Sequence, residues 1–187
     1  VEGTPRFISA ERLAAYPPPR PGCPPRGTEV SVVHDLMIHD LDVVLSLVDS
    51  EVDLVDAVGI AILSPTEDIV NARMAFADGC VATLNASRVS KDRLRKIRVF
   101  KESAYLSLDY QNQKGEMATV VDGAVRFASV PVREGNALLS EIQDFCRCVR
   151  VAKETGEVQH PRVSGSAGLK ALALADRIAE ACRAVRQ

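Results

Sequence analysis

The 187-residue sequence has no tryptophan, and aromatic residues make up only 4% of it. Acidic and basic residues nearly balance, so the net charge of −2 lacks the positive excess that nucleic-acid-binding proteins usually carry. No apolar run approaches the length of a membrane span, and residues 1–5 lack the basic and apolar parts of a signal peptide. We therefore expect a globular protein with neither nucleic-acid nor membrane partners.

Several familiar catalytic and cofactor motifs are also missing. The sequence contains no Gly-x-Gly-x-x-Gly, P-loop, Gly-x-Ser-x-Gly or His-Glu-x-x-His pattern, so no cofactor-binding residue is predicted within the chain. The five cysteines are odd in number and form neither a disulfide framework nor a zinc-ligand pattern, so no metal site is predicted. Free thiols of this kind favour a reducing, cytoplasmic location.

One stretch, Val32–Val48, stands out by its helical spacing of apolar residues at three- and four-residue steps. At about 100° per residue, Asp35, His39, Asp42 and Ser46 fall within roughly 60° of one another on the same helix. A carboxylate one turn from an imidazole can orient it and raise its basicity, as a general acid or base requires. The same spacing is equally typical of a solvated helix face.

The order of elements predicts a single domain over 1–187. An opening strand and a proline-rich loop occupy 1–28, since the prolines exclude helix and central strand. The motif helix spans 29–48, with Thr28 or Ser31 as its N-cap. Strand-like segments joined by short turns then fill 54–132, and two helices close the chain over 136–187.

This order predicts an α+β fold. Because the links between strands are short, we expect a mostly antiparallel sheet of about six strands with helices packed on one face. The alternation of Ala82, Leu84 and Ala86 with small polar residues leaves a weakly polar opposite face, which suits water or the pairing of subunits.

Other polar features have plainer explanations. The basic run 91–101 fits a solvated strand better than a phosphate-binding patch, because the total charge is near neutral. Residues 165–168 fit a helix start, with Ser164 or Ser166 as its cap. His160 precedes a proline in an extended link, which favours a surface position over a ligand.

The chain resembles the C-terminal domain of the Gfo/Idh/MocA oxidoreductases over essentially its whole length. Asp35-Leu36-Met37-Ile38-His39-Asp40 is similar to the family's Asp-x-x-x-His motif. The tail resembles the family's closing pattern in three segments, 137–145, 160–165 and 168–172.

This resemblance implies a substrate-binding and oligomerising domain of an NAD- or NADP-dependent enzyme. The cofactor would be bound by a Rossmann domain that is absent from this chain, so the chain alone is expected to be inactive. The substrate would be a sugar, cyclitol or nucleotide sugar. The Asp-Leu-Met-Ile-His-Asp-Leu-Asp form looks most like members acting on UDP-sugars such as UDP-N-acetylglucosamine.

The resemblance assigns His39 as the acid/base and Asp35 as its partner or a substrate ligand, with Asp42 and Arg12 as substrate-binding residues. The family's usual catalytic lysine has no counterpart here, and Val33-His34 stands where a Gly-Gly pair often precedes the aspartate. A homo-oligomer formed through the sheet face is also expected.

Two other hypotheses remain. In the first, the chain is a non-catalytic binding or dimerisation module in which Asp35 and His39 are structural. In the second, it is a metal-dependent hydrolase using His34, Asp35, His39 and Asp42. His34 points about 100° away from Asp35 along the helix, so one metal ion would not easily collect all four.

Overall fold

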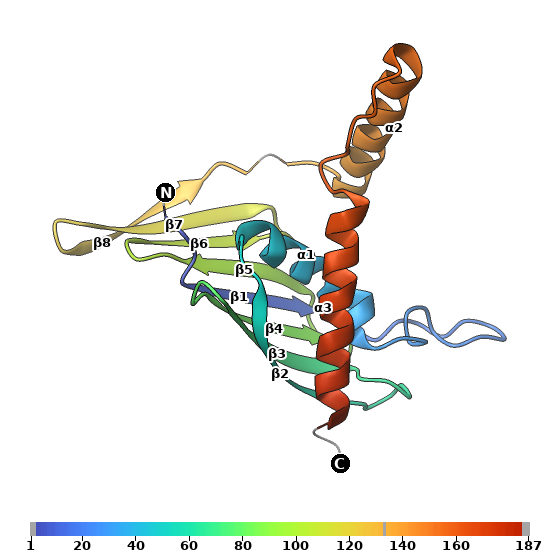
Figure 1. Ribbon diagram of the computed structural model, residues 1–187. Helices are drawn as coiled ribbons and strands as arrows, with labels where there is room; N and C mark the ends of the chain where they lie inside the picture. Colours follow the sequence, from blue (N-terminus) through green and yellow to red (C-terminus); the bar gives the residue numbers. More distant parts are fainter. Residues whose placement is uncertain (1–2, 133, 185–187) are drawn as a thin grey trace.

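The computed structural model describes residues 3–132 and 134–184, and it shows an α+β fold built on one mixed sheet (Figure 1). The strands are β1 (Phe7–Leu13), β2 (Val52–Ile60), β3 (Ile69–Phe76), β4 (Val81–Ser87), β5 (Leu94–Phe100), β6 (Ala104–Asp109), β7 (Lys114–Val121) and β8 (Ala124–Val130). The helices are a π-helical turn η1 (Val33–Met37), α1 (Ile38–Leu47), α2 (Ala137–Thr155) and α3 (Gly165–Ala184).

The sheet has eight strands in the order β2-β3-β4-β1-β5-β6-β7-β8, two more than the expected six. The difference arises because every predicted strand, including the opening one, joins the same sheet. β1 lies between β4, which it pairs in parallel, and β5, which it pairs antiparallel. All other neighbours are antiparallel, as the short links predict. The N-terminal strand therefore joins two antiparallel meanders.

One face of the sheet carries the core. Alternate residues of the central strands, such as Ile8, Leu84 and Ile97, are almost completely buried there. α1 and α3 lie over this face and against each other (Figure 1). Leu41 of α1 and Ile178 of α3 are fully buried in the same cluster. Each such side chain contributes about 1.5–3 kcal/mol through burial, so this layer fixes the position of the motif helix.

The opposite face is open along the middle of the sheet, as the alternation in β4 predicts. A row of aromatic rings crosses it, with centroids 5.5 Å apart for Phe7 and Phe100 and 4.9 Å apart for Phe100 and Tyr105. Arg98 of the basic run donates a hydrogen bond to Glu11 at 3.0 Å. The run is a strand with one buried and one solvated face, as expected.

The motif helix begins at Val33, later than the predicted 29. Thr28 does not cap it, because its hydroxyl donates to Pro25 O at 2.7 Å and closes a turn in the preceding loop. Ser31 is not the N-cap either, because Val32 holds that position, but the Ser31 hydroxyl accepts from the Val33 backbone N–H at 3.2 Å. The residues from 29 up to the start of the helix belong instead to the segment that connects the proline-rich loop to the helix.

The closing helices α2 and α3 lie close to their predicted positions. Asn136 accepts from the Leu139 backbone N–H, Gly156 ends α2 in the left-handed region, and Ser164 accepts from the Ala167 N–H. However, α2 does not lie on the sheet. It projects beyond the start of α3 (Figure 1), and its apolar stripe is 40–65% exposed at Leu138, Leu139, Ile142, Phe145 and Val149. No helix in the described ranges is both long and apolar enough to span a bilayer.

Candidate functional site

A fully buried arginine, Arg88, holds together the loops next to the motif helix. It follows β4, and its guanidinium donates five hydrogen bonds of 2.7–3.1 Å. The acceptors are Asp68 Oδ1, the Thr66 hydroxyl and the backbone carbonyls of Gly27, Val30 and Glu67. All five guanidinium N–H groups thus have partners, which a buried arginine needs to offset its desolvation. Two of these acceptors lie in the segment that leads into η1.

The partner carboxylate, Asp68, is fully buried as well. Its Oδ2 accepts from the backbone N–H groups of Ile62, Leu63 and Ser64 at 2.6–2.9 Å. Burial opposes ionisation of Asp68, but the hydrogen bonds from Ser64 and Arg88 outweigh it and hold its pKa well below the usual range. The loop after β2 and the loop before η1 are therefore fixed to one ion pair.

This support places Gly27 directly against Asp35. Gly27 has a φ of +84°, and a Cβ at that position would lie 2.7 Å from Oδ2 of Asp35. Glycine is required here twice, for its backbone conformation and for the space that the carboxylate occupies. The Asp35 carboxylate thus rests on the backbone of a loop that Arg88 anchors.

Asp35 lies in η1, where the Ile38 N–H donates to the Val33 carbonyl in place of the usual four-residue closure. Asp35 is half-buried and His39, at the start of α1, is exposed. Burial raises the pKa of Asp35, while the charges of Arg88, His39 and Arg26 oppose that rise. Asp35 and His39 are therefore close enough to interact by charge, as their spacing predicts, although among the described contacts no hydrogen bond joins their side chains.

Arg12 is on the buried face of β1. It donates to Asp40 of α1 through Nε at 2.6 Å and through Nη2 at 2.9 Å, a buried bidentate ion pair. Tyr110 lies close enough to feel both charges: burial and Asp40 raise its pKa to about 12, against the opposing effect of Arg12. This pair holds α1 to the sheet at the position next to His39. Arg12 is among the residues expected at the site, whereas no sequence signal pointed to its partner Asp40.

The other polar residues of the motif helix differ in their surroundings. His34 Nε2 lies 2.9 Å from Asp176 Oδ1, which links η1 to α3. Asp42 is half-buried one turn beyond His39, and Ser46 is exposed with its hydroxyl bonded to its own helix at Val43 O. The described residues include no group of three or more His, Cys, Asp or Glu side chains placed to hold a metal ion.

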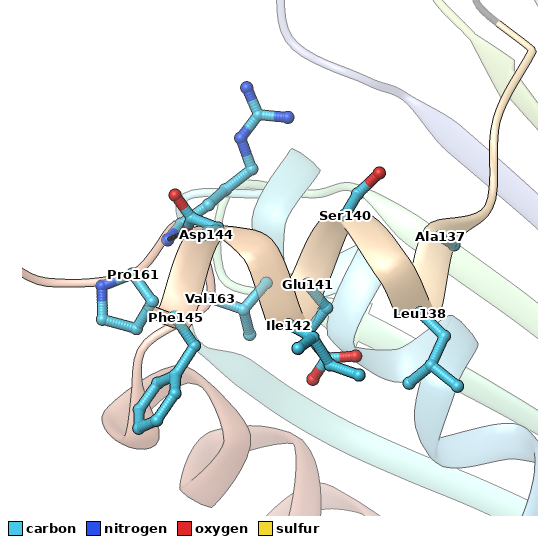
Figure 2. Close-up of a pocket in the computed structure, with 10 residues that line it drawn as sticks. Ala137, Leu138, Ser140, Glu141, Ile142, Asp144, Phe145, Pro161 and Val163 are labelled. Carbon is cyan, nitrogen blue, oxygen red and sulfur yellow. Dashed lines mark hydrogen bonds between the residues drawn. The ribbon is translucent and has the colours of Figure 1, made fainter. Parts of the chain in front are cut away.

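A hollow of about 690 Å³ lies away from the motif helix, along α2 and the link that follows it. Figure 2 shows Leu138, Ile142 and Phe145 on one side of α2 and Ser140 and Asp144 on the other. Asp144 accepts from the Arg162 backbone N–H at 2.7 Å, which draws the link back along the helix. Three residues of the exposed apolar stripe, Leu138, Ile142 and Phe145, line the hollow together with Pro161 and Val163 of the link.

Comparison with known proteins assigns the fold. The family model described as the GFO/IDH/MocA C-terminal domain matches residues 2–107. The chain belongs to the GFO/IDH/MocA family. The match covers the Asp-x-x-x-His motif and the sheet as far as β6, so the family expected from the sequence is confirmed.

Among its relatives in this family, the UDP-N-acetylglucosamine 3-dehydrogenase of Acidithiobacillus ferrooxidans is 35% identical over 191 aligned positions, 99% of this chain and 57% of that protein. A solved structure of that enzyme has a TM-score of 0.84 at 34% identity. Levoglucosan dehydrogenase in complex with NADH and levoglucosan matches at a TM-score of 0.77 and 18% identity, over 97% of this chain and 57% of that one. This GFO/IDH/MocA chain therefore spans just over half the length of the relatives that it matches.

The sequence contains no glycine-rich dinucleotide-binding motif. What the chain does offer is a carboxylate and an imidazole side by side at an open helix surface, on a rigid support. That pair can bind and orient a polar ligand and exchange a proton with it.

Proposed function

We propose that this chain is the substrate-binding and acid–base part of an NAD- or NADP-dependent oxidoreductase that acts on a nucleotide sugar such as UDP-N-acetylglucosamine. The observation that carries the proposal is the placement of Asp35 and His39 on a buried support, in a chain 35% identical to a UDP-N-acetylglucosamine 3-dehydrogenase over nearly its whole length. At that identity, and with the motif intact, a related substrate is the best-supported inference.

Oxidation of a sugar hydroxyl to a carbonyl releases the hydroxyl proton. An imidazole nitrogen of His39 takes that proton, and returns it when the reaction runs toward the alcohol. Asp35 orients the imidazole or accepts a hydrogen bond from a neighbouring sugar hydroxyl. Asp42, one turn further on, is proposed to bind the same substrate.

Arg12 is proposed as a substrate residue with its guanidinium already bound at Nε and Nη2 to Asp40. The N–H groups that Asp40 leaves for a ligand are the second one on Nη2 and the two on Nη1. Its contribution to the site therefore includes holding α1, and with it His39, against β1.

The cofactor is proposed to bind a separate Rossmann domain, because the relatives are longer than this chain by a domain-sized share of their length. The apolar stripe of α2 is the surface that such a domain would cover. Five large apolar side chains exposed along one helix are rare unless a partner buries them. On this proposal the 187-residue chain alone is inactive.

The test is steady-state kinetics with UDP-N-acetylglucosamine and NAD or NADP, on a gene product that includes the cofactor-binding domain. His39→Ala should lower kcat by about 10²–10⁴-fold, the usual contribution of a general acid or base. His160→Ala, at an exposed histidine far along the chain, should leave kcat unchanged. An unaltered kcat in His39→Ala would remove His39 from the acid–base role.

A second function is favoured by the open sheet face. The aromatic row Phe7, Phe100 and Tyr105 lies beside the opposite charges of Glu11 and Arg98, so the surface is suited to a second copy of itself. We propose that this face pairs subunits in a homo-oligomer. If Phe100→Glu leaves the oligomeric state in sedimentation unchanged, the interface lies elsewhere.

The state of the cysteines bears on the cellular compartment in which the protein works. No disulfide joins the cysteines within the described residues, and Cys80, Cys148 and Cys182 are buried. We propose that the protein works in the reducing cytoplasm, where such thiols persist.

A further inference from the structure

Two arginines of the proline-rich loop, Arg20 and Arg26, have very different surroundings. Arg20 donates to the Pro24 carbonyl through Nε and Nη2 at 3.0 and 2.6 Å, and through Nη2 to Glu29 at 3.1 Å. Arg26 is exposed and, within the contacts described for this chain, forms neither a hydrogen bond nor an ion pair. Its guanidinium therefore keeps its full capacity to bind an anion.

The position of Arg26 is fixed by its neighbours. The Thr28 backbone N–H donates to Pro25 O at 3.2 Å, and the Thr28 hydroxyl donates to the same oxygen. Gly27, with its φ of +84°, stands at the third position of this four-residue turn, as a type II turn requires. Arg26 occupies the second position of the turn.

Gly27 of the same turn lies next to two residues of the candidate site, Arg88 and Asp35. The Gly27 carbonyl accepts from Arg88 Nη1 at 2.7 Å, and the Gly27 backbone touches the Asp35 carboxylate. Arg26 therefore extends from the residue next to the one on which Asp35 rests. Its charge also reaches the site, since it is among those that favour the ionised form of Asp35.

We propose that Arg26 binds the diphosphate of the nucleotide-sugar substrate and so holds the sugar ring over Asp35 and His39. This inference rests on the function proposed above. A guanidinium offers two parallel N–H donors to phosphate oxygens, and the diphosphate is the only strongly anionic part of such a substrate. Because the turn is closed by hydrogen bonds, is preceded by Pro24 and begins with Pro25, little order has to be imposed on it when the substrate binds.

The sugar and the diphosphate would then be recognised by adjacent parts of one segment. The turn 25–28 would take the anion, and η1 with the start of α1 would take the hydroxyl that reacts. Such an arrangement favours sugars carrying a nucleoside diphosphate over free sugars. Arg26 would determine specificity without touching the reacting atoms.

The experiment compares Arg26→Gln with Arg20→Gln in a gene product that includes the cofactor-binding domain. Arg26→Gln should raise the KM for UDP-N-acetylglucosamine about 10- to 100-fold, the loss expected for charge-assisted hydrogen bonds, with kcat changed less than about threefold. Arg20→Gln should change neither constant, because its guanidinium is engaged within the loop. Arg26→Lys should recover part of the loss.

Inhibition by fragments separates the diphosphate from the base. The inhibition constant of UDP should rise in Arg26→Gln by a factor similar to that of KM, while the inhibition constant of uridine should stay the same. A normal KM in Arg26→Gln, or an equal effect on UDP and uridine, would overturn the assignment of Arg26. If the unmodified enzyme oxidises no nucleotide sugar, the proposed function itself fails, and this outcome is distinct from the first.

Discussion

The Nε of Arg88 lies 2.7 Å from Oδ1 of Asp68, while Oδ2 of the same carboxylate accepts three consecutive backbone N–H groups. One carboxylate therefore fixes an arginine and a loop at the same time. Through the Gly27 and Val30 carbonyls, the arginine in turn fixes the segment that enters the motif helix. The position of Asp35 next to this segment thus depends on a buried ion pair.

Removing the guanidinium should be costly. Arg88→Leu leaves a buried Asp68 charge without its partner, so we expect the free energy of unfolding to fall by about 3–5 kcal/mol in urea titrations. Arg6→Leu, which removes an exposed pair with Glu102 at 3.6 Å, should cost about 0–1 kcal/mol. Equal losses in the two variants would contradict the structural role of Arg88.

Gly27 should be less replaceable than a second loop glycine, Gly22. Both have positive φ, but a Cβ at Gly22 meets nothing within 4 Å, whereas one at Gly27 meets the Asp35 carboxylate. Gly22→Ala should cost about 1–2 kcal/mol from backbone conformation alone. Gly27→Ala should cost more and should also lower the activity of the complete enzyme, because Asp35 must move. Thermal unfolding and kcat measured on both variants test this, and a Gly22→Ala loss as large as that of Gly27→Ala would refute it.

The Arg12–Asp40 pair should show strong energetic coupling. A double-mutant cycle of Arg12→Met and Asp40→Asn should give a coupling free energy of about 0.5–3 kcal/mol, the range for contacting residues. If Arg12 also binds substrate, Arg12→Met should raise KM by more than Asp40→Asn does. Additive effects on stability would mean that the two side chains do not support each other in solution.

Asp35 should make the protein less stable at neutral pH than in mild acid. Its pKa is raised in the folded state, chiefly by burial and against the charges of Arg88, His39 and Arg26, so the native chain holds the proton more tightly than the unfolded chain. The contribution of Asp35 to stability is therefore greatest below the ordinary aspartate pKa and declines as pH rises through the raised value. Asp35→Asn should remove that decline and become the more stable protein at neutral pH. Urea titrations from about pH 4 to about pH 7 would show the difference growing with pH, and a difference independent of pH would exclude this account.

Much of the fold follows from local sequence patterns. Alternating residues identify each strand, and caps such as Asn136, Gly156 and Ser164 mark the closing helices. The sheet order does not follow, because the pairing of β1 with β4 joins segments some seventy residues apart with no signal in either. The stripe on α2 indicates that the helix is covered, but periodicity cannot show whether its own sheet or another unit covers it.

The candidate site was predictable only in part. Asp35 and His39 are one helical turn apart, so their proximity follows from spacing. Arg88 follows a strand and has no spacing relation to its five acceptors, all of which lie outside any regular element. Its burial is evident only once the loops are in place. Asp40 lies within the motif itself, but its partner Arg12 is twenty-eight residues away.

The central position of β1 has a consequence for how the chain acquires its structure. Residues 7–13 leave the ribosome before both of their neighbours, 81–87 and 94–100, have been made. Until then this strand has two unsatisfied edges, and the two meanders on either side have no common member. We therefore expect the joining of the sheet around β1 to be the slow, late step of folding, with the motif helix settling only after it, since Arg12 on that strand holds Asp40. The site is thus among the last parts of the molecule to become native.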